Sequence, residues 1–375
     1  MRTLDTGYTS EVDNVDKHQW YGSLLKFNDA TFYQTWSFGA VRWGEKNFSH
    51  LILKKDDSIV SMAQLRIVKV KNLNVGAAYL NWGPVWRSID QKSEIMHLKN
   101  MLRALYIEYV DRRGLMLRIL PKIIPEPVKE AVLTVFTEEE YNYSPDPQQT
   151  VVVDLSPNMD DLRKNLPKGI RHSLNAAAKN DLEFYEIQDD KSFAIVLRIF
   201  NEMQQRKNFT AFGSPEEIIA VYKDLANTVK QKMILCKHDG EAVAIIGWQT
   251  IGQYGFPLVA CTGNKALKLK AGTLLFWKMI EWYKENGYLC CDLAGVNPRR
   301  NPGGYFFKKS LAGRSYVETP HYIGQFDAYN NLGSFILMKS GFYMRDIYRT
   351  IRSDVSTWLK LFKKTDRADN NKSDE

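Results

Sequence analysis

The sequence has few cysteines and no long apolar run. Only four of its 375 residues are cysteine, and two of these, Cys290 and Cys291, are adjacent. None lies in a C-x-x-C pair or near a histidine at zinc-ligand spacing, which argues against a structural metal site. No stretch reaches 18 apolar residues, and the first residues lack the apolar core of a signal peptide. We therefore expect a cytoplasmic protein without metal or membrane-spanning helix.

The overall composition is that of an ordinary globular protein. Hydrophobic residues make up 44% and charged residues 25%, with 23 glycines and 13 prolines. A chain of this length buries a large core without the help of disulfides. Lysine and arginine together number 51 against 43 acidic residues, a formal net charge of +8. This excess favours polyanionic partners such as tRNA, nucleotide phosphates or an anionic membrane surface.

The pattern of apolar residues predicts two mixed units in tandem. The first half contains alternating runs typical of strands, followed by a helical repeat that ends at Gly114 and by a further strand, 116–120. The second half runs strand, helices, a hairpin around Asp239-Gly240, a third strand, a helix over 272–286 and a final strand. This order of elements is that of the GNAT-like acyltransferase fold. We therefore expect an α+β protein with two GNAT-like acyltransferase domains. The predicted boundaries are 1–150 for domain 1 and 151–329 for domain 2.

The C-terminal part is basic and amphipathic. Over residues 332–364, aromatic and aliphatic residues mix with arginine and lysine, as on a helix that packs against protein or lies on an anionic membrane. We expect a C-terminal helix, residues 330–364, that packs back on domain 1. The alternative is peripheral contact with the inner membrane leaflet. Residues 365–375 are polar and are predicted to form a disordered tail.

Five segments in order along the chain carry a family resemblance. They are Gln34–Arg42, Tyr79–Val85 with its Gly-Pro-Val, Lys168–Leu174, Gly272–Gly295, and Asn301–Lys308 followed by Gly313. Together they resemble the FemABX family of peptidoglycan-bridge aminoacyltransferases and the related BioF/CelD-type acetyltransferase domain. The resemblance implies transfer of an aminoacyl group from aminoacyl-tRNA to an amine of a peptidoglycan precursor or another nucleotide- or lipid-linked envelope precursor. It implies no cofactor and no DNA partner.

The resemblance also implies which residues form the site. Lys308, next to Phe307, matches the family's Phe-Lys pair and is expected to stabilise the tetrahedral intermediate. Aminolysis of an ester needs a neutral amine, an aligned carbonyl and a cation for the developing oxyanion, so no Ser-His-Asp set is required. The alternative for Lys308 is a solvated lysine, which is the usual fate of that residue type.

Three basic residues are expected to bind phosphate. Arg42 stands at the family's N-terminal cation position, and Lys168 and Arg171 lie in a stretch free of acidic residues from Arg163 to Asn180. Guanidinium groups suit phosphate oxygens. The segments around Arg42, Arg171 and Lys308 are expected to border one cleft between the domains. Further residues expected at the substrate site are Gly83, Tyr305 and Asp292.

Two alternatives remain open from the sequence. An acyl-CoA-dependent N-acyltransferase of polysaccharide synthesis, with acetyl-CoA or another acyl-CoA as co-substrate, uses a glycine-rich turn for the pyrophosphate. The segment Leu267–Thr273 has a single glycine, which disfavours CoA. A non-catalytic RNA-binding module is the other alternative, although the aromatic and basic residues are not interleaved in the usual way. Arg87 replaces an Asp that many relatives have, and no long helical arm follows Arg206, so the acceptor stays open.

Overall fold

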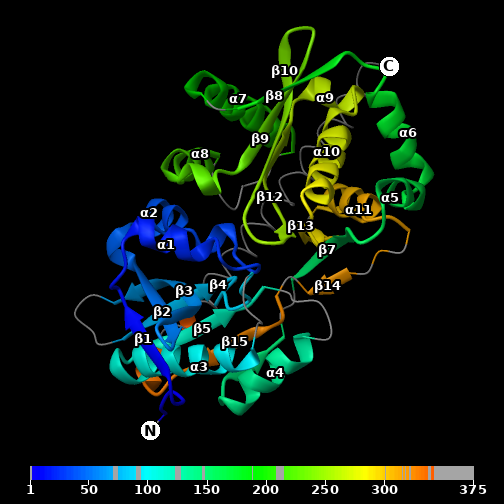
Figure 1. Ribbon diagram of the computed structural model, residues 1–375. Coiled ribbons are helices and arrows are strands. Elements are labelled where there is room, and N and C mark those ends of the chain that lie inside the picture. The colour runs from blue at the N-terminus through cyan, green and yellow to red at the C-terminus, as the bar shows by residue number, and fades with distance from the viewer. Residues whose placement is uncertain are drawn as a thin grey trace, which may run out of the picture.

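The protein folds into two units, one built on each half of the chain (Figure 1). The structure is a computed structural model. It describes residues 2–70, 75–89, 94–122, 128–145, 148–187, 189–207, 215–299, 301–314, 316, 318–320, 322–336 and 339–341. Both units combine sheets with helices, which confirms the expected α+β class.

A seven-stranded sheet forms the centre of the first unit. Its strand order is β1-β2-β3-β4-β5-β15-β6, and every neighbouring pair is antiparallel except β4 and β5. Side chains alternate between the two faces of this sheet, so that Leu51 and Leu53 belong to one apolar cluster and Ile52 to another. The strands are β1 Tyr8–Val12, β2 Phe48–Lys55, β3 Ser58–Lys69, β4 Gly76–Asn81, β5 Met116–Leu120, β6 Asn142–Ser144 and β15 Gln325–Ala328.

Helices cover both faces of this sheet. On one face lie α3, Ile95–Leu105, its π-helical continuation η3, Tyr106–Arg112, and α4, Val128–Glu138. On the other lie α1, Lys17–Leu24, and α2, Trp36–Trp43. Short 3₁₀ turns occur at η1, Phe32–Gln34, and η2, Glu45–Asn47.

The second unit is built on two four-stranded sheets. One has the order β12-β10-β9-β8 and the other β11-β13-β7-β14. Because β12 and β13 belong to different sheets, the two sheets diverge at this point, and α10 packs against strands of both. The strands are β7 Gln149–Asp154, β8 Leu182–Glu186, β9 Lys232–His238, β10 Glu241–Trp248, β11 Tyr254–Gly255, β12 Pro257–Thr262, β13 Cys290–Val296 and β14 Glu318–Pro320.

Seven helices of the second unit surround these sheets. Helix α10 begins at Ala271, one residue before the predicted start at Gly272, and its buried face carries Leu275, Trp277 and Ile280. The helices are α5 Met159–Asn165, α6 Lys168–Ala177, α7 Asp190–Lys207, α8 Pro215–Asp224, α9 Asn264–Lys268, α10 Ala271–Glu285 and α11 Pro302–Leu311, with a 3₁₀ turn η4 at Asn227–Val229.

The predicted boundary at residue 329 differs from the structure. Strand β15 pairs with β5 and β6, so residues 325–328 lie in the sheet of the first unit. Arg118 and Asp327 stand opposite each other across β5 and β15, and their buried side chains form a two-pronged ion pair at 2.7 and 2.8 Å. The chain therefore leaves the first unit, builds the second, and returns to complete the first sheet.

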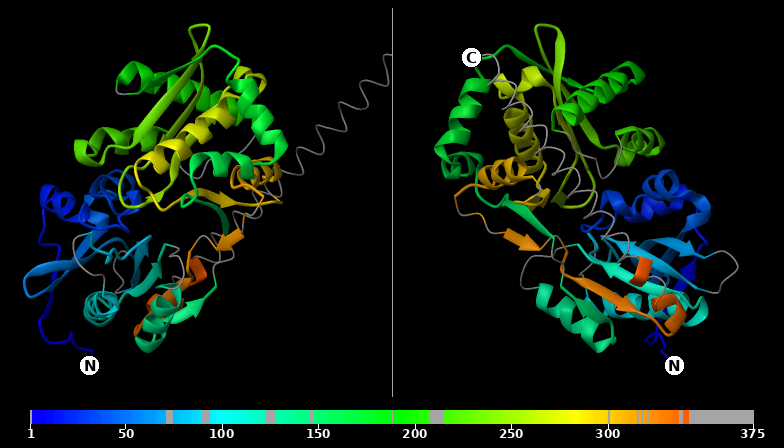
Figure 2. Two further views of the ribbon diagram at one scale, coloured as in Figure 1. Left: turned by 45° about the vertical axis from the view of Figure 1, so that its right-hand side comes forward. Right: turned by 180° about the vertical axis from the view of Figure 1, so that it is seen from behind.

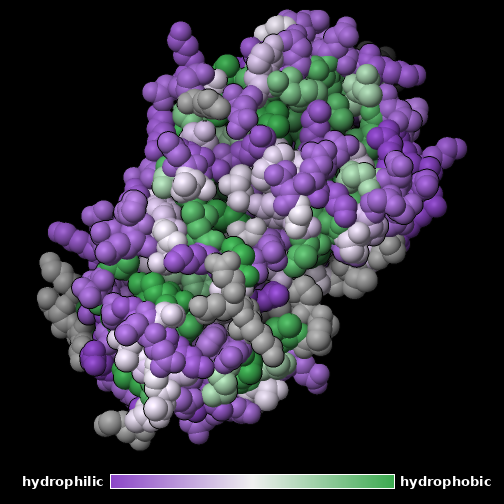
Figure 3. Space-filling view, viewed as in Figure 1, coloured by the Kyte–Doolittle hydropathy of each residue, from purple (hydrophilic) through white to green (hydrophobic). Residues whose placement is uncertain are grey.

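The two units share a continuous apolar contact. Val221, Leu225, Val229 and Ile251 of the second unit join the cluster around Trp20 on the first. Backbone bonds cross the same boundary, because the N–H of Gln253 donates to the carbonyl of Asn28 at 2.8 Å. Figure 2 shows α1 and α2 facing the second unit in both views. On the face drawn in Figure 3, apolar side chains are visible where the units meet.

The start of the C-terminal segment lies on the first unit. The hydroxyl of Ser334 donates to the carbonyl of Gly114 at 2.8 Å and accepts from the N–H of Gly76 at 3.2 Å. The rest of the predicted helix, from residue 342 to 364, and the predicted tail, 365–375, lie outside the described residues. Within the part of the chain that the structure describes, no helix combines the length and the apolar character needed to cross a membrane.

Candidate active site

Lys308 projects from α11 toward a loop that follows β13. Asn301 caps the helix by accepting from the N–H of Gly304 at 3.0 Å, and Pro302 occupies its first turn. The half-buried Lys308 Nζ donates to the carbonyls of Ala294 and Gly295 at 3.2 and 3.0 Å. Two of its three N–H groups are thereby used, which leaves one for a substrate oxygen.

Asp292 supports the loop to which Lys308 binds. It is only 1% exposed, and its Oδ1 accepts from the hydroxyl of Thr150 and from the backbone N–H of Ala294, the latter at 2.8 Å. Ala294 has a φ of 68°, which a residue other than glycine rarely adopts. The Asp292 carboxylate thus holds the bend that turns the carbonyls of residues 294 and 295 toward Lys308.

Burial makes the Lys308 amine less basic than usual. Desolvation lowers its pKa to about 8, Asp292 opposes this shift, and the positive charge of Lys207 adds to it. An amine with this pKa is still mostly protonated at pH 7. It can therefore act as a cation beside a developing oxyanion.

Phe307 and Tyr305 fix α11 in place. The ring of Phe307 meets that of Phe276 on α10 edge to face, with centroids 5.2 Å apart. The hydroxyl of Tyr305 lies 3.4 Å from that of Tyr316. Phe306, between them, is 61% exposed. The structure thus gives Phe307 a packing contact at the predicted site, and it leaves Phe306 as the exposed aromatic residue of this helix.

Lys168 and Arg171, which are both predicted to bind phosphate, line one cavity. The cavity lies between α5 and α6, and its volume is about 530 Å³. Arg171 Nε is buried and has no hydrogen-bond partner among the described residues. The cavity is lined by Asp160, Arg163, Lys164, Lys168, Arg171, His172 and Asn175. Four lysine or arginine side chains against one aspartate make it strongly basic.

Arg42 does not join this cavity. It lies on α2, and its guanidinium binds Glu217 of α8 at 2.6 Å. Figures 1 and 2 place α2 and α6 on opposite sides of the molecule. The expectation that Arg42, Arg171 and Lys308 border one cleft is therefore wrong for Arg42 and Arg171. Sequence order cannot reveal this separation, because it depends on how the two units dock.

Gly83 has a packing role in the structure. A Cβ at this position would lie 2.9 Å from Leu80 Cδ1 and 3.0 Å from the side chain of Gln34. Only glycine allows the strand end to approach Gln34, whose amide donates to the carbonyls of Gln64 and Asn81. The glycine of the Gly-Pro-Val motif is thus explained by its close packing against Leu80 and Gln34.

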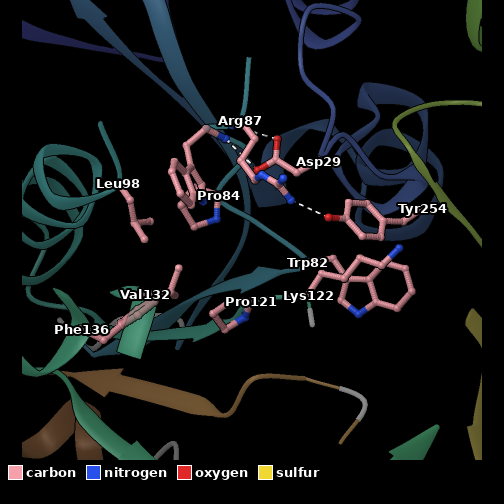
Figure 4. A pocket seen from close by; sticks show the side chains of 11 residues that line it. Asp29, Trp82, Pro84, Arg87, Leu98, Pro121, Lys122, Val132, Phe136 and Tyr254 are labelled. Carbon is pink, nitrogen blue, oxygen red and sulfur yellow. Dashed lines mark hydrogen bonds between the residues drawn. The ribbon is translucent and has the colours of Figure 1, made fainter. Parts of the chain in front are cut away.

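A cavity between the two units was missed by the sequence interpretation. It is lined by Asp29, Trp82, Pro84, Trp86, Arg87, Leu98, Pro121, Lys122, Val132, Phe136 and Tyr254, most of which Figure 4 labels. Tyr254 comes from the second unit, and the other residues come from the first. The available signal in the sequence was Arg87, because the resemblance led us to expect an Asp at this position. Lys122 gave no such signal, because a single lysine commonly follows an apolar strand.

Comparison with known proteins agrees with this architecture. Residues 161–309 match the acetyltransferase (GNAT) domain family, which covers the segment from α5 to Lys309 in α11. This part of the chain is accordingly similar to a GNAT-type acetyltransferase domain. A search of curated proteins of similar sequence finds no match.

Over most of the chain, the fold is similar to that of FemX. The crystal structure of FemX superposes with a TM-score of 0.72 at 13% identity, covering 87% of this chain and 99% of FemX. A protein of unknown function from Bacteroides thetaiotaomicron superposes with a TM-score of 0.55 at 12% identity, covering 85% and 99% of the two chains. The expected FemABX-like fold of two tandem GNAT-like units is thereby confirmed.

Proposed function

We propose that the protein is an aminoacyltransferase that moves an aminoacyl group from aminoacyl-tRNA to an amine of a peptidoglycan or other cell-envelope precursor. The observation that carries the proposal is the FemX-like fold over 87% of this chain and 99% of FemX. The hydrogen bonds that hold the Lys308 amine at residues 294 and 295 support it. We place the reaction in the cytoplasm, with a nucleotide-linked or lipid-linked acceptor.

The arrangement around Lys308 suits aminolysis of an ester. The acceptor amine attacks the ester carbonyl, the C–N bond forms, the C–O bond to the ribose breaks, and the proton lost by nitrogen goes to the departing ribose oxygen. The ammonium group of Lys308 donates its remaining N–H to the oxyanion of the tetrahedral intermediate. Because the carbonyls of residues 294 and 295 hold Nζ in place, little reorganisation is needed when charge develops.

The basic cavity between α5 and α6 supports a polyanionic donor. Arg163, Lys164, Lys168 and Arg171 present four positive charges around one hollow, and the buried Nε of Arg171 has no partner among the described residues. An RNA backbone offers phosphate oxygens at the spacing needed to meet several such groups at once. We assign this cavity to the backbone phosphates of the donor.

The start of α10 disfavours CoA. A Cβ on Gly272 would lie 2.7 Å from Thr262 Cγ2, so this single glycine serves the packing of the helix against β12. Lys270 stands at the N-cap with a left-handed φ of 56° and makes no side-chain cap bond. We propose that no cofactor is used. The acyl-CoA-dependent N-acyltransferase stays the second candidate, because the matched domain family is described as an acetyltransferase.

A donor competition decides between the two enzymes. The full chain is titrated calorimetrically with a charged tRNA mixture and, separately, with acetyl-CoA. Transfer of a radiolabelled amino acid to a membrane and nucleotide-precursor extract is followed in parallel. We expect saturable tRNA binding, label in the extract, and no acetyl-CoA binding. Tight acetyl-CoA binding without a tRNA response would overturn the proposal in favour of the second candidate. A response to neither donor would indicate a non-catalytic protein.

A further inference from the structure

The cavity between the units contains a buried lysine whose amine makes no hydrogen bond within the described part of the chain. Lys122 follows β5 and Pro121, is 8% exposed, and lines the cavity with its amine. Nζ lies 4.6 Å from the ring centre of Trp82 and 5.0 Å from that of Tyr254, so it is flanked by one aromatic ring from each unit. Among the residues that the structure describes, Lys122 Nζ has no hydrogen-bond partner (Figure 4).

The neighbouring charges do not satisfy this amine. Both carboxylate oxygens of Asp29 accept backbone N–H groups, from Trp86 at 3.0 Å and Arg87 at 3.1 Å. The guanidinium of Arg87 donates to the hydroxyl of Tyr254. Burial lowers the pKa of Lys122, and the charges of Asp292 and, more weakly, Asp29 oppose this shift through space. Two cationic side chains therefore line this cavity together with one carboxylate whose oxygens are already bound.

A buried ammonium group without an acceptor is costly, since it has lost its hydration and gained no hydrogen bond. Aromatic rings compensate for part of that loss. The cavity volume is about 20 Å³, which is room for about one water-sized oxygen. The cavity therefore has room for a single anionic oxygen at the end of a larger group, and this oxygen would accept a hydrogen bond from Lys122.

We propose that this cavity binds an anionic oxygen of the acceptor, from a carboxylate or a phosphate, and that Lys122 is its charge partner. Arg87 supplies a second positive charge in the same cavity. Asp292 acts electrostatically on both Lys122 and Lys308, so the cavity and the Lys308 site share one neighbouring carboxylate. The assignment of the anion to the acceptor rests on the proposed function. The binding of an anion at Lys122 does not.

Fluorine NMR of trifluoroacetate added to the full chain tests the site directly. We expect saturable broadening of the fluorine signal that is at least about tenfold weaker in Lys122→Met, because a charge-assisted bond is lost. Lys99→Met removes the same charge at the surface, where Nζ binds Glu138, and is expected to change affinity less than about twofold. Equal binding by wild type and Lys122→Met, or no binding by wild type, would overturn the proposal.

Competition then identifies the anion. Acetate and methylphosphonate are added to the trifluoroacetate complex, and the one that displaces it at lower concentration indicates a carboxylate or a phosphate as the natural group. Displacement by neither would contradict a specific anion site. Thermal melting provides the check on folding. Because Lys122→Met replaces an unpartnered buried cation by an apolar chain of similar length, its melting temperature is expected to rise. A lower melting temperature of Lys122→Met would instead indicate that Lys122 stabilises the fold.

The transfer assay separates this site from the reaction itself. Lys122→Met is expected to raise KM for the acceptor at least about tenfold while kcat is kept, since binding is lost before the chemical step. An unchanged KM would overturn the assignment to the acceptor. If the wild type transfers nothing from any donor, the proposed function fails, and the fluorine titration still decides whether Lys122 binds an anion.

Discussion

Asp292 supports Lys308 through the backbone of one residue. The carboxylate accepts the N–H of Ala294 at 2.8 Å, and the carbonyl of the same residue accepts from Lys308 Nζ at 3.2 Å. A buried acid in one strand thus sets the position of a cation on a helix that follows it in the chain. Substitutions of Lys308 and of Asp292 can therefore test the candidate site separately.

Replacing Lys308 by Met is expected to lower kcat about 10²–10³-fold, because one charged donor to an oxyanion is worth about that much. Met keeps most of the volume of the side chain, so the circular dichroism spectrum and the melting temperature are expected to stay close to wild type. Lys309→Met is the matched control, since Lys309 lies over the Tyr316 ring and not on the loop at 294–295. Equal losses in the two variants would contradict the role of Lys308.

The pH dependence of the rate is expected to show an alkaline limb near pH 8. The pKa of Lys308 is about 8, so the side chain is a cation below that pH and is neutral above it. Stabilisation of an oxyanion needs the cation, and kcat is therefore expected to fall as pH rises through this value. In Lys308→Arg the guanidinium stays charged, so the limb is expected to disappear although the rate is lower. If kcat of Lys308→Arg still falls near pH 8, the titration of a group other than Lys308 causes the fall.

Truncating Asp292 is expected to reduce both stability and rate. Asp292→Ala leaves the hydroxyl of Thr150 and the N–H of Ala294 without their acceptor, which costs about 1–3 kcal/mol in the free energy of unfolding per buried group. Asp292→Asn keeps an acceptor oxygen and is expected to lose less stability. Urea unfolding of the two variants measures the difference. Equal destabilisation would show that charge, and not hydrogen bonding, holds the loop.

The ion pair between Arg42 and Glu217 is expected to contribute little to stability. The two side chains are 30% and 43% exposed, and pairs of this kind are worth about 0.2–1 kcal/mol. A double-mutant cycle with Arg42→Ala and Glu217→Ala measures the coupling in urea unfolding. If Arg42 also contacts a substrate phosphate, Arg42→Ala weakens substrate binding far more than Glu217→Ala. Equal effects of both variants on binding would exclude this contact.

Salt dependence tests the basic cavity. Binding of tRNA is expected to weaken steeply with salt, and Arg171→Ala is expected to reduce the slope of log K against log salt by about 1. Arg198→Ala, on α7 outside the cavity, is the matched control and should leave the slope unchanged. A slope that does not change in Arg171→Ala would place the phosphates elsewhere.

Elements that depend on local patterns are predicted closely from the sequence. Strand β5 has the bounds expected for it, 116–120, and α10 begins one residue before its expected start, whereas α11, the helix that carries Lys308, is not among the expected elements. The separation of Arg42 from Arg171 and the cavity at Lys122 depend on the docking of the two units. That docking is set by apolar contacts between residues far apart in the chain, such as Trp20 with the cluster that contains Leu225.

The placement of β15 has a consequence for synthesis on the ribosome. The strand lies between β5 and β6 in the sheet, although about 200 residues of chain separate it from β5 and about 180 from β6. Until residue 328 has left the exit tunnel, β5 and β6 lack the strand that pairs with both of them. Arg118 also lacks the carboxylate of Asp327 during this time. The first unit to be translated is therefore the last to be completed. A nascent chain that stops before residue 325 has an incomplete first sheet even when its second unit is whole.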